Sequence, residues 1–320
     1  MVRILLGIAL LAGGMATAQR VTVVRLGVFP NVTHGAGLVA IDQGFFQKQL
    51  GKVKLDVRYF SNGTQIAEAF MAGTLDFAYT GPVPAINAFL RGVPIQIVSS
   101  AANGGVVLVA RRDAQIKGIS DLNGKTVAVS ARGATQDILL RHILNDSGLK
   151  VQDQGGSVTL VPLDPSLLTT AFANQRMDAA LVQEPWGALL ESQGAKVVLN
   201  EKHLWKDGNY VTTVFVGNPT FMRNNPEITR QMLKGNLAAI QWIRTSKSKA
   251  QESISKMIFQ VTKQQPDPKT LSKALSRTQI TDQLNLSSLQ DYARLNQEAG
   301  FARDIPDFGM LVDRSWLPKQ

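Results

Sequence analysis

Short apolar runs alternate with stretches of helical period between residues 23 and 199. Runs rich in β-branched residues predict strands, and apolar residues repeated every three or four positions predict helices. The expected strands are Val23–Phe29, Leu55–Tyr59, Phe77–Thr80, Ile95–Ser99, Val106–Ala110, Thr126–Val129, Val158–Val161, Ala179–Val182 and Lys196–Leu199. The expected helices are Gly35–Gln49, Thr64–Ala72, Pro84–Leu90, Ala134–Asn145, Leu167–Asn174 and Pro185–Gln193. This alternation predicts an α/β fold with mostly parallel sheets flanked by helices.

The chain beyond residue 200 has a different character. One more strand is predicted at Tyr210–Gly217, and helices are expected at Pro226–Thr245, Lys249–Gln260, Pro268–Ser276 and Ser288–Gly300. A chain of this kind builds one α/β unit, then a second, and finally returns to the first. We therefore expect residues 19–105 with 213–320 to form lobe I and residues 106–212 to form lobe II. Two crossings, near Ala102–Val109 and Asn209–Gly217, are expected to act as a hinge.

An internal repeat accompanies this division. Thr33 and Thr135 each follow a short apolar strand and precede a helix, and they lie 102 residues apart. The same offset relates AFMAGTLDFA, residues 69–78, to AFANQRMDAA, residues 171–180. One constant spacing over two separate matches indicates duplicated α/β units. Because ligands bind beyond the carboxyl ends of strands in such sheets, the repeat predicts polar loops that face each other across a cleft.

The stretch DLNGKTVAVSARGATQDILLRHILN, residues 121–145, is the clearest strand, loop and helix start in the chain. A helix start carries unpaired N–H groups and partial positive charge, so Gly133, Ala134 and Thr135 are candidates to hold a small anion. The alternative is that Thr135 only caps its own helix, which is a common use of threonine.

The N-terminus has the pattern of a secretory signal. Arg3 precedes the apolar run Ile4–Leu11, and Ala16-Thr17-Ala18 forms an A-x-A cleavage site. The apolar run is far shorter than the ~20 residues of a membrane span. We therefore expect cleavage after Ala18 and a soluble periplasmic protein.

Charge and composition exclude several classes of function. The net charge is +10, and between Lys202 and Arg277 there are 13 Lys and Arg against 4 Asp and Glu. This excess is interpreted as a solvated basic helical face, because basic residues interleaved with aromatic ones in a nucleic-acid-binding module are not seen. The chain has no cysteine, and its three histidines lack metal-ligand spacing. No catalytic residue, metal or cofactor is predicted.

Four segments resemble the periplasmic substrate-binding components of ABC importers for aliphatic sulfonates, taurine and nitrate. They are GVFPNVTHGAGLVAIDQGFF, YTGPVPAINAF, ISDLNGKTVAVSARGATQDILLRHIL and LVQEPWGALL. The resemblance implies a two-lobed periplasmic binding protein fold of type II, a small anionic solute, and membrane permease and ATPase partners, with the protein itself a monomer. The alternatives are a binding protein for a pyrimidine or thiamine precursor or another small heterocycle, and a periplasmic ligand sensor.

The resemblance also implies a set of ligand-binding residues. They are Asn31, Thr33, His34, Thr80, Gly81, Pro82, Gly133, Ala134, Thr135, Gln136, Glu184 and Trp186, with Arg132 added from the same loop. Asn31 and Thr33 have alternative roles as turn and cap residues, Trp186 as a core residue, and Arg132 as a solvated surface residue. Glu184 would repel an anion, so it is expected either to bind a cationic part of the ligand or to point away.

Overall fold

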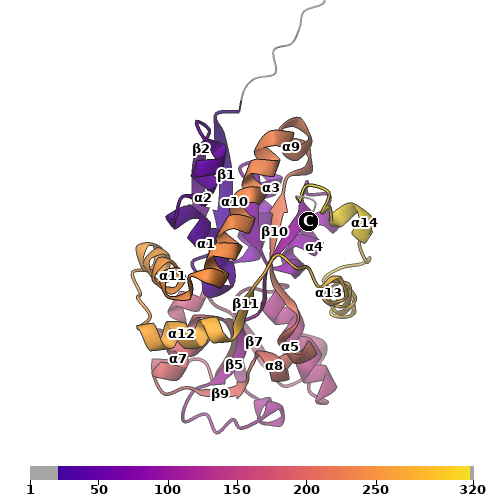
Figure 1. Cartoon of the computed structure of the whole chain (residues 1–320). Coiled ribbons are helices and arrows are strands. Elements are labelled where there is room, and N and C mark those ends of the chain that lie inside the picture. Colours follow the sequence, from indigo (N-terminus) through magenta and orange to yellow (C-terminus); the bar gives the residue numbers. More distant parts are fainter. Residues whose placement is uncertain (1–20, 318–320) are drawn as a thin grey trace, which may run out of the picture.

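A computed structural model describes residues 21–317 and contains two β-sheets with helices around them (Figure 1). Sheet A has six strands in the spatial order β11, β4, β10, β3, β1, β2. Their bounds are β1 Val23–Val28, β2 Lys54–Tyr59, β3 Phe77–Thr80, β4 Gln96–Gly104, β10 Val211–Gly217 and β11 Thr278–Ile280. β1 is parallel to β2 and β3, whereas β10 is antiparallel to both of its neighbours, β3 and β4.

Sheet B has five strands in the order β7, β6, β8, β5, β9. Their bounds are β5 Val106–Ala110, β6 Thr126–Val129, β7 Thr159–Pro162, β8 Ala179–Gln183 and β9 Lys196–Leu199. β6 is parallel to β7 and β8, and β5 is antiparallel to β8 and β9. The order β2, β1, β3, β10, β4 therefore has its counterpart in β7, β6, β8, β5, β9, and each sheet contains one inserted antiparallel strand.

Two aspartates that are 102 residues apart accept equivalent hydrogen bonds in the two sheets. The Arg25 N–H in β1 donates to the Asp76 carboxylate over 2.8 Å, and the Thr126 N–H in β6 donates to the Asp178 carboxylate over 2.9 Å. Asp76 and Asp178 are one of the matched pairs in the two repeat segments. Each aspartate ties the start of one strand to the start of its neighbour, so the matched sequence has a structural cause.

Fourteen α-helices lie within the described residues and cover the sheets. Their bounds are α1 Gly35–Asp42, α2 Phe45–Leu50, α3 Gly63–Met71, α4 Pro82–Leu90, α5 Thr135–Asp146, α6 Leu168–Ala173, α7 Trp186–Ser192, α8 Glu201–Leu204, α9 Pro219–Asn224, α10 Pro226–Thr245, α11 Lys247–Thr262, α12 Pro268–Ser276, α13 Leu286–Glu298 and α14 Phe308–Leu311. The expected single helix 35–49 is divided into α1 and α2 because Gly44 adopts a left-handed conformation with φ 70°. None of the helices in this part of the chain combines the length and apolar content needed to cross a bilayer.

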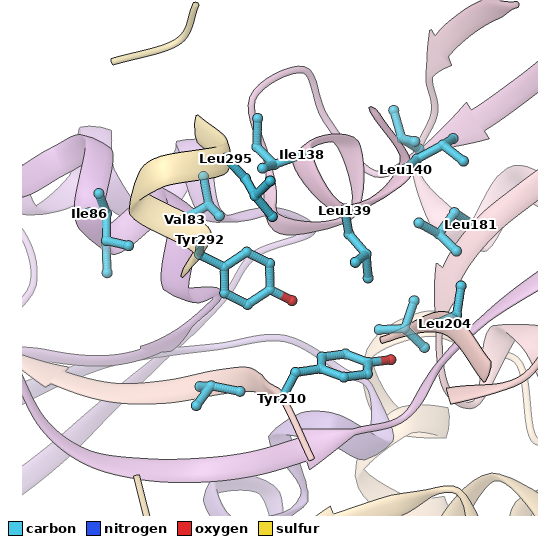
Figure 2. Packing of buried hydrophobic residues seen from close by; sticks show 14 of the residues in the cluster. Val83, Ile86, Ile138, Leu139, Leu140, Leu181, Leu204, Tyr210, Tyr292 and Leu295 are labelled. Carbon is cyan, nitrogen blue, oxygen red and sulfur yellow. The ribbon is translucent and has the colours of Figure 1, made fainter. Parts of the chain in front are cut away.

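A continuous apolar cluster joins the two sheets through α4, α5 and α13. Figure 2 shows Val83 of α4 and Tyr292 of α13 beside Leu139 of α5, with Tyr210 below them. Tyr292 and Tyr210 are fully buried. Because α4 follows a strand of sheet A and α5 follows a strand of sheet B, this cluster holds the two halves of the molecule together on one side.

The chain crosses between the sheets twice, and the two crossings lie side by side. Gly104, the last residue of β4, and Gly105, between β4 and β5, both have positive φ values, of 64° and 72°. The Gly104 N–H donates to the Tyr210 carbonyl over 2.9 Å, and the Asn103 side chain donates to that of Asn209 over 3.2 Å. The return to sheet A at Asn209–Val211 is thus hydrogen-bonded to the first crossing.

Candidate functional site

A cavity of about 470 Å³ lies where loops from sheet A meet loops from sheet B. The sheet A side comes from the segments after β1 and β2 and the start of α3, and the sheet B side comes from the segment after β7 and the start of α7. The end of α11 completes the wall. The lining residues are Phe29, Pro30, Asn31, Tyr59, Phe60, Ser61, Gln65, Asp164, Pro165, Ser166, Leu167, Trp186, Val261, Thr262 and Gln264. Its volume lies within the range typical of small-molecule sites.

Asn31 and Trp186 are the two sequence-predicted residues that line this cavity. Asn31 is buried, and its side-chain amide donates to Gln183 Oε1 over 2.9 Å. The next residue, Val32, donates its N–H to the Glu184 carbonyl, also over 2.9 Å. The loop after β1 is therefore bonded directly to the loop after β8, and Asn31 connects the two sheets at the cavity edge.

Thr33 and His34 lie behind Asn31, and neither lines the cavity. The Thr33 hydroxyl donates to Asn31 Oδ1 over 3.1 Å. His34 stacks on Phe29 with ring centroids 4.2 Å apart, and its Nδ1 accepts the Phe29 N–H over 3.1 Å. Because Nδ1 accepts, the ring proton is on Nε2, which has no hydrogen-bond partner among residues 21–317. Burial lowers the pKa of His34 to about 3, so the imidazole is neutral.

The starts of α4 and α5 touch each other across the two sheets. The Val83 N–H donates to Thr135 Oγ1 over 3.4 Å, and a Cβ placed on Gly81 would lie 2.5 Å from that same oxygen. Thr135 therefore faces Gly81 and the buried Pro82 rather than Thr33, whose hydroxyl bonds Asn31. The loop that carries Thr135 therefore faces the start of α4 and not the loop that carries Thr33.

Two buried polar groups flank this contact. Thr80 Oγ1 and Gln136 Nε2 have no hydrogen-bond partner in the described part of the chain, although Thr80 is 1% and Gln136 3% exposed. Gln136 Oε1 accepts from the Ser130 hydroxyl over 3.1 Å, which fixes the orientation of the amide. A buried unpaired polar group costs about 1–3 kcal/mol. Both groups are therefore candidates for contact with a bound solute.

The N–H groups of the loop before α5 are hydrogen-bonded to other groups of the protein. The Gly133 N–H donates to the Asp137 carboxylate over 2.7 Å, and the Ala134 N–H donates to the Ala131 carbonyl over 3.3 Å. The expectation that these two N–H groups are available to an anion is therefore wrong for this conformation. Arg132 is 64% exposed in its side chain and pairs with Asp153 over 2.8 Å, which matches the interpretation of a solvated surface residue.

Glu184 is fully buried and points to a protein cation. Its carboxylate accepts from Arg277 Nη1 over 2.8 Å and from the Ala188 N–H over 2.8 Å. Burial raises the pKa of Glu184, and the hydrogen bond from Arg277 counteracts the rise. Arg277 also pairs with Glu191 over 3.0 Å. Of the two sequence-based alternatives, the structure therefore selects the one in which Glu184 points away from a ligand.

Sequence reasoning missed several residues at the site. Phe60 and Asp164 line the cavity, and Arg277 holds Glu184. Phe60 and Asp164 lie just after strand ends, so the rule that ligands bind beyond strand ends could have identified them. Arg277 lies 93 residues after Glu184, at the end of a helix, and carries no comparable signal. Among residues 21–317, no group of three or more potential ligands is placed to hold a metal.

Comparison with known proteins finds similarity to solute-binding proteins. It is 28% identical to the taurine-binding periplasmic protein of Escherichia coli over 205 residues, or 63% of this chain and 61% of that protein. It is 24% identical to the nitrate/nitrite binding protein NrtA of Nostoc over 250 residues, or 71% of this chain and 55% of that protein. The chain thus spans about three fifths of the length of the curated relatives it matches.

Solved structures show the same fold. The alkanesulfonate-binding protein SsuA from Xanthomonas axonopodis, bound to MOPS, superposes with a TM-score of 0.76 at 20% identity, covering 91% of this chain and 98% of that one. The nitrate-binding protein NrtA from Synechocystis gives 0.77 at 16% identity, covering 92% and 87%. The expected two-lobed binding-protein fold is confirmed. The profile of the NMT1-like family matches residues 17–259, and the chain belongs to that family.

Proposed function

We propose that the protein is the solute-binding component of an ABC importer. It takes a small anionic solute between its two sheets and delivers it to a membrane permease driven by an ATPase. The relatives named for taurine and nitrate binding support this proposal, as does the cavity built from both sheets. The signal pattern at residues 1–18, which lie outside the described residues, supports a periplasmic location. The proposal includes no catalytic step.

The single observation that most supports an anionic solute is the pair of buried unpartnered groups, Thr80 Oγ1 and Gln136 Nε2. They lie beside the starts of α4 and α5, helices of nine and twelve residues whose N-terminal ends carry partial positive charge. Thr80 also lies close to the cavity wall, because a Cβ on Gly63, the first residue of α3 and located between the lining residues Ser61 and Gln65, would lie 3.0 Å from the Thr80 hydroxyl. An anionic head group accepts from both side chains and removes their desolvation cost.

The energies are consistent with useful affinity. Hydrogen bonds to a charged group contribute about 1.5–3 kcal/mol each. Micromolar binding requires about 8 kcal/mol. Two such bonds supply about 3–6 kcal/mol, and burial of the rest of the solute in the cavity has to supply the remainder.

The test is calorimetric titration with taurine, methanesulfonate and nitrate. Thr80→Val and Gln136→Leu each remove one unpartnered group while keeping the side-chain volume similar, so affinity should fall roughly ten- to hundredfold. Stability of unliganded Thr80→Val should stay the same or rise, because a buried unsatisfied group is removed, whereas Gln136→Leu also loses the hydrogen bond from Ser130 and should be somewhat less stable. Thr33→Val is the matched control, since the Thr33 hydroxyl bonds Asn31, and it should bind like the wild type. Wild-type affinity in both Thr80→Val and Gln136→Leu would refute this role, and failure of the wild type to bind any of the three anions would refute the proposed ligand class.

A further inference from the structure

The wall of the cavity has a composition that a bare inorganic anion does not require. Four aromatic residues line it, Phe29, Tyr59, Phe60 and Trp186. Leu167, which is 53% exposed, adds apolar surface. The lining set contains no lysine, arginine or histidine. Aromatic rings offer large apolar faces that prefer to stack on another flat group, so the wall favours a ligand with a flat organic body.

The size of the cavity leads to the same conclusion. At about 30 Å³ for each water in the liquid, a volume of about 470 Å³ corresponds to roughly fifteen waters. Nitrate or a two-carbon sulfonate leaves most of this space filled with water. A ring that displaces water from the aromatic faces gains the burial energy that a small ion does not.

The one charged residue in the lining is Asp164. Its Oδ1 accepts from the N–H and the hydroxyl of Ser166, over 2.9 and 2.8 Å. Its Oδ2 has no partner within residues 21–317 and remains available. The segment that carries Asp164 is closed against the end of α11, where Gln264 donates to the Ser166 carbonyl over 3.2 Å. A carboxylate here repels a second negative charge on the ligand and attracts a cationic group.

We propose that the natural solute is an organic anion whose body is a flat ring, with a cationic or hydrogen-bond-donating group at the end away from its anionic head. This inference rests on the proposed function, because it places the head at Thr80 and Gln136. The ring lies among the four aromatic side chains, and the far end meets Asp164. Selection for the ring comes from the wall, and selection for the charge at the far end comes from Asp164.

Calorimetry with a graded set of sulfonates tests the ring. 4-Methylbenzenesulfonate should bind at least about tenfold more tightly than methanesulfonate, because burying a ring is worth more than the 1.4 kcal/mol that corresponds to a factor of ten. Phe60→Ala should remove most of this advantage by weakening 4-methylbenzenesulfonate much more than methanesulfonate, and circular dichroism shows that the variant is folded. Phe45→Ala is the matched control, since Phe45 packs against Trp242 on α2 and α10, outside the cavity, and it should keep the advantage.

A second pair of probes tests Asp164. Asp164→Asn should weaken 4-(aminomethyl)benzenesulfonate roughly fivefold, as a partly exposed ion pair does, and change 4-methylbenzenesulfonate less than twofold. If methanesulfonate and nitrate bind as tightly as the ring compounds, the inference is overturned and the proposed function stands. If no sulfonate or nitrate binds while a ring compound without an anionic head does, the proposed anion site is overturned. Equal effects of Asp164→Asn on both ring compounds would overturn the role of Asp164.

Discussion

Arg277→Met should be among the most destabilising single substitutions in this protein. Glu184 is 0% exposed in its side chain and Arg277 is 11% exposed. The substitution removes the 2.8 Å bond to Glu184 and the 3.0 Å bond to Glu191. Because it leaves one carboxylate buried without its cation, the free energy of unfolding should fall by about 3–5 kcal/mol.

Lys273→Met is the matched control from the preceding helix turn. Lys273 pairs with Glu191 over 2.6 Å, but its side chain is 47% exposed. Surface pairs of this kind contribute about 0–1 kcal/mol, so this variant should lie close to the wild type. The double variant Glu184→Gln with Arg277→Met should recover much of the loss, because it removes the buried charge as well as its partner.

Urea unfolding followed by circular dichroism measures these differences, and its pH dependence gives a second readout. Burial raises the pKa of Glu184, and loss of Arg277 should raise it further. A buried carboxyl group with a raised pKa favours its protonated form in the folded state. The free energy of unfolding therefore falls as pH rises through that pKa and the group ionises. The deficit of Arg277→Met should therefore shrink as pH falls toward 4.5, the ordinary pKa of glutamate. A loss no larger than that of Lys273→Met, or a deficit independent of pH, would refute the reasoning.

Three further predictions concern other parts of the chain. Burial lowers the pKa of His34 from 6.5 to about 3, so below pH 6.5 the unfolded chain binds a proton that the folded one does not. The free energy of unfolding should therefore fall by up to about 1.4 kcal/mol for each unit that the pH falls below 6.5. The His34 ring resonances in an NMR titration should not move between pH 7 and 5, and a midpoint near 6.5 would contradict this. Gly81→Ala should weaken solute binding, because its Cβ would lie 2.5 Å from Thr135 Oγ1, whereas Gly118→Ala, with no atom within 4 Å, should be neutral in the same calorimetric assay. Mass spectrometry of the exported protein should give a chain that begins at Gln19, and a mass that retains residues 1–18 would contradict the signal assignment.

Local patterns were sufficient for much of the fold. Pro226–Thr245 was predicted with the bounds of α10, because proline at the first position marks its start and the apolar period is regular over five turns. β11 was missed because it has only three residues, Thr278–Ile280, and exists through its pairing with β4. Short segments that owe their conformation to a partner strand leave little trace in sequence.

The site was harder to predict from the sequence than the fold, for a related reason. Asn31 and Trp186 were found because they follow strands and occur in the resemblance. The bonds that fix them are long-range: Asn31 to Gln183 spans 152 residues, and Glu184 to Arg277 spans 93. A single sequence does not show which distant polar residues become neighbours, so the orientation of Glu184 was decided only by the structure.

The insertion of β10 between β3 and β4 has a consequence for the order of folding. Sheet B uses only strands from residues 106–199, and all of its pairings are available once that continuous segment has been made. Sheet A pairs Val214 with Thr80, a closure across more than 130 residues, and its centre remains open until residue 217 is present. Because such closures are slow, sheet B should acquire protection from hydrogen exchange before the centre of sheet A during refolding. The half of the molecule that begins the chain should therefore be the last to be completed.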